Sequence, residues 1–109
     1  MGVPVEYNAF NELNNYRKYG ITDDFTQTID GNTVLKVKFQ TGGTATTERN
    51  GVFIEDLLVV AYAKLDEYNK QLPSRENALA LTKIEESLHW LTARKAEREY
   101  RNVYGTEEK

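Results

Sequence analysis

The strongest pattern in the chain is a row of apolar residues at helical spacing in its second half. Its members recur at three- and four-residue intervals, as one face of an α-helix requires: Ile54, Leu57, Leu58, Ala61, Leu65, Tyr68 and Leu72. Glu55 and Asp56 stand in the first turn, where the helix dipole favours negative charge. The pattern predicts an amphipathic helix that ends before Pro73.

A second row of apolar residues follows Pro73. It consists of Ala78, Leu81, Ile84, Leu88 and Leu91. Ser74 is a favourable N-cap residue, and the pattern predicts a helix running from it to about Arg101. The connection, Leu72 to Ser74, is so short that the two helices must form an antiparallel hairpin.

The part of the chain before residue 51 indicates strands and loops. Phe25 to Ile29 and Thr33 to Gln40 flank Asp30-Gly31-Asn32, a turn signal between two β-prone runs. Odd-numbered positions of the second run face apolar surroundings and its lysines face solvent, so we expect a half-buried hairpin. Asn8 to Lys18 favours a short helix closed by Gly20.

These elements predict an α+β fold: a small N-terminal antiparallel β-sheet followed by a long antiparallel helical hairpin. The Thr-rich run Thr44 to Thr47 is a candidate for one more edge strand. We expect a single domain over residues 1–109, with a strand and loop region at 1–51 and the helical hairpin at 52–103. Two helices alone bury two apolar rows poorly, so we expect the strands or a second copy of the chain to cover them.

Composition narrows the class of protein. The 109 residues include no cysteine, which excludes disulfide frameworks, thiolate zinc sites and cysteine nucleophiles. Fourteen Lys and Arg against 17 Asp and Glu give a net charge of −3, which argues against a general duplex-DNA binder. With a mean hydropathy of −0.65 and no basic, apolar leader in residues 1–10, we expect neither a membrane span nor secretion. Because a chain this short leaves much of its surface uncovered, we expect self-association.

One face of the second predicted helix carries a row of arginines. Steps of four and three residues place on it Ser87, Leu91, Arg94, Arg98 and Arg101. Guanidinium groups match phosphate geometry, so the row is a candidate phosphate clamp. A solvated basic face, or pairing with carboxylates of another subunit, explains it equally well. A polymeric nucleic acid would need more positive charge than this row supplies.

Tyr68 and Asn77 form a second candidate site where the two helices join. A tyrosine ring can stack a purine, and an asparagine can offer a donor and an acceptor to a base edge or ribose. The alternatives are a core tyrosine on the apolar row and a helix-capping asparagine. Other signals are weaker: His89 has no partner motif, and Trp90 is better suited to an interface than to a ligand. No phosphate loop, zinc motif or nucleophile–base pair supports an enzyme, a metal or a cofactor.

Several short strings resemble a phage protein family. They are Phe39-Gln40-Thr41-Gly42, Asn50-Gly51-Val52, Glu55-Asp56-Leu57-Leu58, the long string from Arg75 to Leu91 with Arg94, and Arg101-Asn102-Val103-Tyr104-Gly105-Thr106. Together they resemble the Thoeris anti-defence sponges, which share a helical-hairpin domain with the anti-CBASS sponges. The long string in the second helix is the most specific of them.

The resemblance implies a hexamer without catalytic activity that acts in the cytoplasm of an infected bacterium. Such proteins capture cyclic nucleotide immune signals intact, so that the defence effector is never activated. Glycocyclic ADP-ribose and cyclic dinucleotides bind at one kind of site in the family, and cyclic trinucleotides at another. Two rivals stay open: a non-catalytic hairpin that docks a partner protein through the Trp90 face, and an enzyme that degrades the same signals.

The resemblance also assigns residues. It implies that Tyr68 and Asn77 belong to the first kind of site. We add Arg75, which is in the same Arg-Glu-Asn string, as a candidate for this site. Charge and position before the first helix add Arg49 as a phosphate contact. Tyr68 replaces the usual Phe, which keeps the stacking face and adds a hydroxyl.

For the trinucleotide site, the resemblance implies Arg94 and Arg98, and the spacing of the row adds Arg101. The string that follows Arg101 departs from the usual ending at Asn102 and Tyr104. These departures lie where they could alter the mouth of the trinucleotide site.

Overall fold

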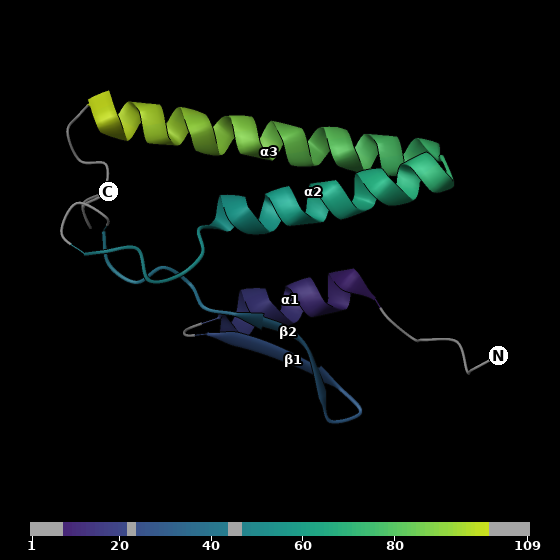
Figure 1. Ribbon diagram of the computed structural model, residues 1–109, viewed down its shortest axis with the longest axis horizontal. Coiled ribbons are helices and arrows are strands. Elements are labelled where there is room, and N and C mark those ends of the chain that lie inside the picture. Colours follow the sequence, from purple (N-terminus) through teal and green to yellow (C-terminus); the bar gives the residue numbers. More distant parts are fainter. Residues whose placement is uncertain (1–7, 22–23, 44–46, 101–109) are drawn as a thin grey trace. The chain divides into compact units, whose positions relative to one another are not determined.

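A computed structural model describes residues 8–21, 24–43 and 47–100 of the chain. The chain divides into two compact units, Met1–Val37 and Lys38–Lys109. The first contains α1, β1 and β2, and the second contains α2 and α3 (Figure 1). The order of elements is that of the expected α+β fold, in which a small antiparallel sheet precedes a helical hairpin.

Helix α1 spans Ala9–Tyr19 and has a signal at each end. The side-chain oxygen of Asn8 accepts hydrogen bonds from the backbone N–H groups of Phe10 (3.0 Å) and Asn11 (3.3 Å), so Asn8 is the N-cap. Gly20 follows with φ +74°, a conformation that glycine adopts without strain. The expected short helix closed by Gly20 is therefore confirmed.

Strands β1 (Phe25–Ile29) and β2 (Asn32–Val37) form an antiparallel hairpin. Asp30 and Gly31 connect them, with φ values of +50° and +81°. Two consecutive positive φ values are typical of the two-residue turn whose twist matches that of a hairpin. Asp-Gly is a favoured pair for this turn, which is why the sequence signal was accurate.

The register of the hairpin contains an irregularity. Gln27 pairs with Leu35, and the next residue of β1, Thr28, pairs with Thr33. Val34 is therefore the extra residue of a β-bulge, and it is half-exposed. The bulge explains why apolar and polar residues alternate imperfectly along β2.

The apolar side of the hairpin is only partly covered. Val37 is buried, whereas Leu35, expected on the same side, is 43% exposed. Tyr16 of α1 packs edge-on against Phe25 of β1, with 5.7 Å between ring centroids. The first unit thus joins its helix to its sheet by an aromatic contact.

Strand β2 ends three residues earlier than the sequence pattern predicts. The residues after Val37 pair with a later part of the chain and not with β1: Phe39 forms a parallel bridge with Val52. Gln40 donates its backbone N–H to Val52 (3.0 Å), and Val52 donates its own to Lys38 (2.8 Å). Three residues of the expected edge strand at 44–47 lie outside the described part of the chain, and Thr47 lies in a bend.

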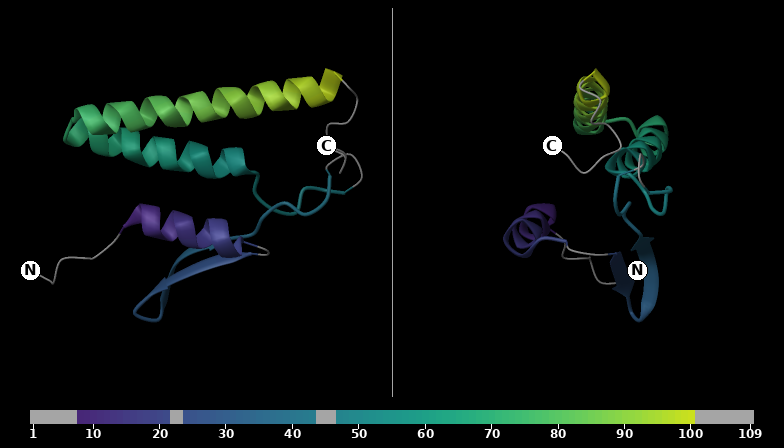
Figure 2. Two further views of the ribbon diagram at one scale, coloured as in Figure 1. Left: turned by 180° about the vertical axis from the view of Figure 1, so that it is seen from behind. Right: turned by 90° about the vertical axis from the view of Figure 1, so that its left-hand side faces the viewer.

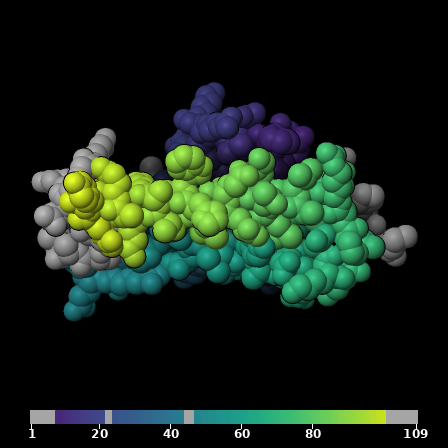
Figure 3. All heavy atoms as spheres, turned by 90° about the horizontal axis from the view of Figure 1, so that it is seen from above, coloured from purple at the N-terminus to yellow at the C-terminus, as the bar shows by residue number. Residues whose placement is uncertain are grey.

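Helices α2 (Ile54–Gln71) and α3 (Arg75–Tyr100) form the predicted antiparallel hairpin (Figure 2). Their lengths are about 27 and 39 Å at 1.5 Å per residue. Seen in space-filling form, they lie side by side (Figure 3). Within the residues that the structure describes, no helix is long and apolar enough to cross a membrane.

The two apolar rows meet only along the middle of the hairpin. Leu81 of α3 is buried, with 6% of its surface exposed. Its neighbours in the interface are half-buried, namely Leu57, Leu58 and Leu65 of α2 and Ile84, Leu88 and Leu91 of α3. Ile54, Tyr68 and Leu72, which belong to the same row of α2, are 52%, 52% and 79% exposed. Part of the apolar row of α2 is therefore available for other contacts.

Candidate functional site

The loop before α2 is held by two amide side chains. The side-chain oxygen of Gln40 accepts hydrogen bonds from the backbone N–H groups of Asn50 (2.9 Å) and Gly51 (3.2 Å). The Asn50 carboxamide pairs with both backbone groups of Thr41, at 2.9 and 3.0 Å. These contacts join the Phe-Gln-Thr-Gly and Asn-Gly-Val strings, whose role here is to shape the entry to the hairpin.

Gly51 is required at this point because two backbone segments approach closely. A Cβ atom at position 51 would lie 2.5 Å from the carbonyl carbon of Phe39 and 2.6 Å from the oxygen of Lys38. Neither atom belongs to a side chain that could move aside. A residue with a side chain would therefore force the loop apart.

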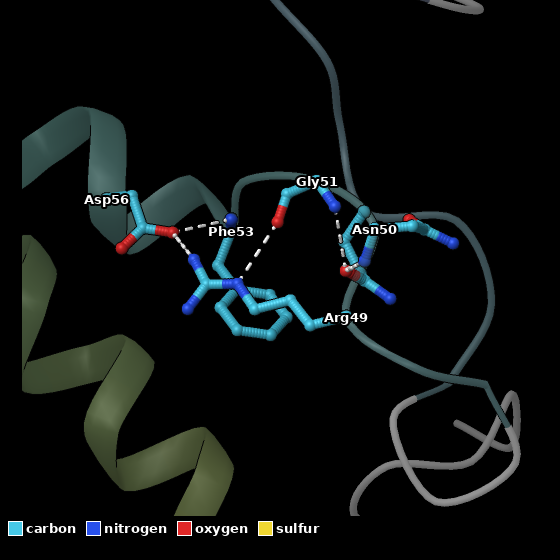
Figure 4. A network of polar contacts seen from close by, with 6 residues as sticks. Arg49, Asn50, Gly51, Phe53 and Asp56 are labelled. Carbon is cyan, nitrogen blue, oxygen red and sulfur yellow. Dashed lines mark hydrogen bonds and ion pairs between the residues drawn. The ribbon is translucent and has the colours of Figure 1, made fainter.

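Arg49 is the centre of a polar cluster at the start of α2 (Figure 4). Its guanidinium forms an ion pair with Asp56 and donates a hydrogen bond to the carbonyl of Gly51 (3.1 Å). It also lies over the ring of Phe53, 4.4 Å from the centroid. Asp56 in turn accepts the Phe53 N–H at 2.8 Å, which fixes the first turn of α2. Arg49 thus has a structural role, and its side chain is still 55% exposed.

The tip of the hairpin is held by polar contacts of Ser74, in the connection between its two helices. The hydroxyl of Ser74 accepts the N–H of Asn77 (3.0 Å), which confirms Ser74 as the N-cap of α3. Asn69 accepts the Ser74 N–H through its side-chain oxygen at 3.1 Å. The backbone N–H of Asn77 is therefore bonded to the Ser74 hydroxyl. The side chain of Asn77 is half-buried and is not the group that caps the helix.

Tyr68 lies in the last turn of α2 and is more exposed than a core tyrosine. Over half of its surface, 52%, is exposed. The ammonium group of Lys64, one turn earlier, lies 5.0 Å from its ring centroid. The same ammonium is 3.4 Å from a carboxylate oxygen of Glu67. An aromatic face and a cation thus occur side by side on the surface of α2.

The structure brings some of the expected site residues together and separates others. Tyr68, Arg75 and Asn77 all lie at the tip of the hairpin, where α2 ends and α3 begins. Arg49 precedes the opposite end of α2, about 20 Å away along the helix axis. In one chain, Arg49 therefore does not share a site with Tyr68.

Arg49 lies instead at the same end of the hairpin as the arginine row. Tyr62 of α2 contacts Glu85 of α3, so the antiparallel arrangement places the first residue of α2 opposite roughly residue 93. Arg94 is exposed at this end of the hairpin, while Arg98 is buried, with 8% of its surface exposed. Arg98 has interaction partners and is not a free cation. Arg101 lies outside the described residues.

The comparison with known proteins matches the part of the chain that contains the hairpin. Residues 31–96 match the family profile described as "Acb2/Tad1, hairpin domain". The chain belongs to the Acb2/Tad1 hairpin-domain family. This family membership confirms the resemblance found in the sequence strings.

This member of the Acb2/Tad1 hairpin-domain family is also similar to a curated phage protein. The protein named Thoeris anti-defense 1, from Bacillus phage SBSphiJ7, is 47% identical over 74 residues. The alignment covers 67% of this chain and 52% of that protein. The chain therefore spans about half the length of this relative.

The Acb2/Tad1 match includes most of the candidate residues. Tyr68, Asn77 and Arg94 lie within it, and Arg98 lies beyond its last residue. Lys64 also lies within it, although the sequence reasoning did not single it out. Its spacing of four residues from Tyr68 is the signal that would have found it, because such residues are neighbours on a helix.

Proposed function

We propose that this protein binds cyclic nucleotide immune signals and sequesters them without cleavage, as a phage anti-defence protein in the cytoplasm of the infected host. By holding the signal, it keeps a Thoeris or CBASS effector inactive. The observation that carries the proposal is the exposed ring of Tyr68 at the tip of a hairpin that belongs to the Acb2/Tad1 family. The name of the Bacillus phage relative supports the anti-defence role.

The hairpin tip suits a small nucleotide that contains a base and phosphates. Tyr68 offers an aromatic face for stacking, and Asn77 offers a carboxamide for a base edge or a ribose. Arg75, in the first turn of α3, is exposed and supplies a guanidinium for a phosphate. We assign glycocyclic ADP-ribose and cyclic dinucleotides to this site.

The other end of the hairpin suits a ligand with more phosphates. Arg94 is exposed there, Arg98 is beside it on the same helix face, and the sequence spacing adds Arg101, which lies outside the described residues. Arg49 adds a further guanidinium at this end of the second unit. We assign cyclic trinucleotides to this second site.

The exposed apolar surface of α3 supports self-association, and we propose a homohexamer. Trp90 and Tyr100 are 76% and 90% exposed, and aromatic side chains of this kind are enriched in contacts between protein chains. Light scattering on the purified protein measures the number of copies directly.

A capture-and-release assay tests the proposed function. The protein is incubated with glycocyclic ADP-ribose, cyclic dinucleotides or cyclic trinucleotides and filtered, and the retained fraction is then heated and chromatographed. We expect the ligand to disappear from the filtrate and to return intact on heating. Ligand that returns chemically altered would show an enzyme instead.

Failure to capture any of these ligands would favour a second function. Trp90 would then mark a surface for a partner protein, because its ring is exposed on the helix that supplies most of the hairpin. A stoichiometric protein partner that is lost on Trp90→Ala would support this reading.

A further inference from the structure

Lys64 places a positive charge over one face of the ring that is proposed to stack a base. Its ammonium nitrogen is 5.0 Å from the Tyr68 ring centroid, a distance typical of a cation–π contact. A nucleotide whose base stacks on this ring carries its phosphates within a few bonds of the base. A cation at the ring is therefore within reach of a phosphate.

The present partner of Lys64 is weak enough to be exchanged. Its ammonium lies 3.4 Å from Glu67, and the two side chains are 55% and 56% exposed. Exposed ion pairs of this kind contribute little to stability, because water screens them and two flexible side chains must be held in place. A phosphate group can therefore replace Glu67 as the partner of the Lys64 ammonium at a small cost in free energy. The carboxylate of Glu67 repels that phosphate.

We propose that Lys64 contacts the phosphate of the nucleotide that stacks on Tyr68, and that Glu67 opposes this contact. The proposal rests on the proposed function and adds two residues to the first site. It predicts effects of opposite sign from neighbouring residues: loss of the Lys64 charge weakens binding, and loss of the Glu67 charge strengthens it.

The chain contains a matched control pair on the other helix. Lys83 and Glu86 have the same spacing, lie 3.5 Å apart and are similarly exposed. Within the described part of the chain, the Lys83 ammonium lies over no aromatic ring. Any general effect of changing one charge of the protein will therefore appear in this pair as well.

The test is calorimetric titration of glycocyclic ADP-ribose into the native protein and its variants at low and high salt. We expect Lys64→Gln to weaken binding by about tenfold, the range of a charge-assisted hydrogen bond, and to flatten its salt dependence. Glu67→Gln should tighten binding by about two- to fivefold at low salt, because it removes a repulsive charge. Lys64→Arg should retain most of the affinity, and Lys83→Gln and Glu86→Gln should bind like the native protein.

The outcomes separate this proposal from the proposed function. If Lys64→Gln binds like the native protein while Tyr68→Ala loses binding, the role of Lys64 is overturned and the sponge function stands. Equal weakening of Lys64→Gln at all salt concentrations also overturns it, because Lys64 would then only hold the ring in place. Absence of glycocyclic ADP-ribose binding by the native protein overturns the role of Lys64 and the assignment of that ligand to the hairpin tip, whereas the capture assay with cyclic di- and trinucleotides decides the sponge function separately.

Discussion

The hydroxyl of Tyr62 on α2 donates a hydrogen bond to the carboxylate of Glu85 on α3 and joins the two helices near the middle of the hairpin. This bond raises the pKa of the Tyr62 phenol above its ordinary value of 10.0, because a deprotonated tyrosine could not donate it. Nearby negative charge, from Glu85 and then Asp66, acts in the same direction. The folded protein therefore favours the protonated phenol.

The first prediction is a stability difference that depends on pH. Because the pKa is raised on folding, the contribution of Tyr62 is fully present below the unfolded value near 10 and is lost as pH rises through the higher folded value. We expect Tyr62→Phe to be less stable than the native protein at pH 8, with a difference that shrinks above pH 10. Urea unfolding of both proteins between pH 8 and 11 measures it, and a difference that stays constant across this range would contradict the assignment.

Local signals explain why much of the fold could be predicted from the sequence. Three such signals determine the backbone of their immediate neighbours, namely Asn8, Ser74 and the Asp30-Gly31 pair. The elements that they begin or connect can therefore be predicted without knowledge of any distant contact. The end of β2 depends instead on Val52, fifteen residues after Val37, which replaces the strand partner. No local pattern in β2 contains that information.

The residues of the candidate site also divide into those that local sequence places and those that depend on distant parts of the chain. Tyr68 and Asn77 could be placed at one end of the hairpin because a three-residue connection leaves no other arrangement. The burial of Arg98 could not be predicted from the spacing of the arginine row. Spacing determines the helix face on which a residue lies, but not which other residues cover that face. The charge of Arg49 and its position before α2 predict a phosphate contact in the first site, and within one chain the length of α2 separates Arg49 from Tyr68 by about 20 Å.

The second prediction concerns the close approach at Gly51. We expect Gly51→Ala to destabilise the protein by about 1–3 kcal/mol, because the new methyl group would overlap the backbone at Phe39. Gly20→Ala is a comparison with a different cause: nothing lies within 4 Å of its Cβ position, so only its backbone conformation (φ +74°, ψ 179°) is penalised, by about 1–3 kcal/mol. Thermal unfolding followed by circular dichroism compares the two, and a Gly51→Ala protein as stable as the native one would disprove the overlap.

The third prediction tests the cap of α3. Ser74→Ala removes the acceptor of the Asn77 N–H, and we expect a loss of about 1 kcal/mol. Ser87→Ala serves as the control, because the Ser87 hydroxyl donates to Lys83 within the same helix and its removal leaves no unpaired N–H. Urea unfolding should therefore distinguish the two serines, and equal effects would show that the cap contributes nothing specific.

The last prediction separates binding from stability along the arginine row. Arg94 is exposed, so we expect Arg94→Ala to weaken cyclic trinucleotide binding by about tenfold or more and to leave the melting temperature unchanged. Arg98 is buried and engaged, so Arg98→Ala should also destabilise the fold, by about 1–3 kcal/mol. The two readouts are a trinucleotide titration and a thermal melt of each variant, with Lys83→Gln as a surface control.

Unchanged trinucleotide affinity in a folded Arg94→Ala protein would remove this end of the hairpin from the binding surface. Equal loss of glycocyclic ADP-ribose binding in that variant would mean that the two kinds of ligand do not use separate sites.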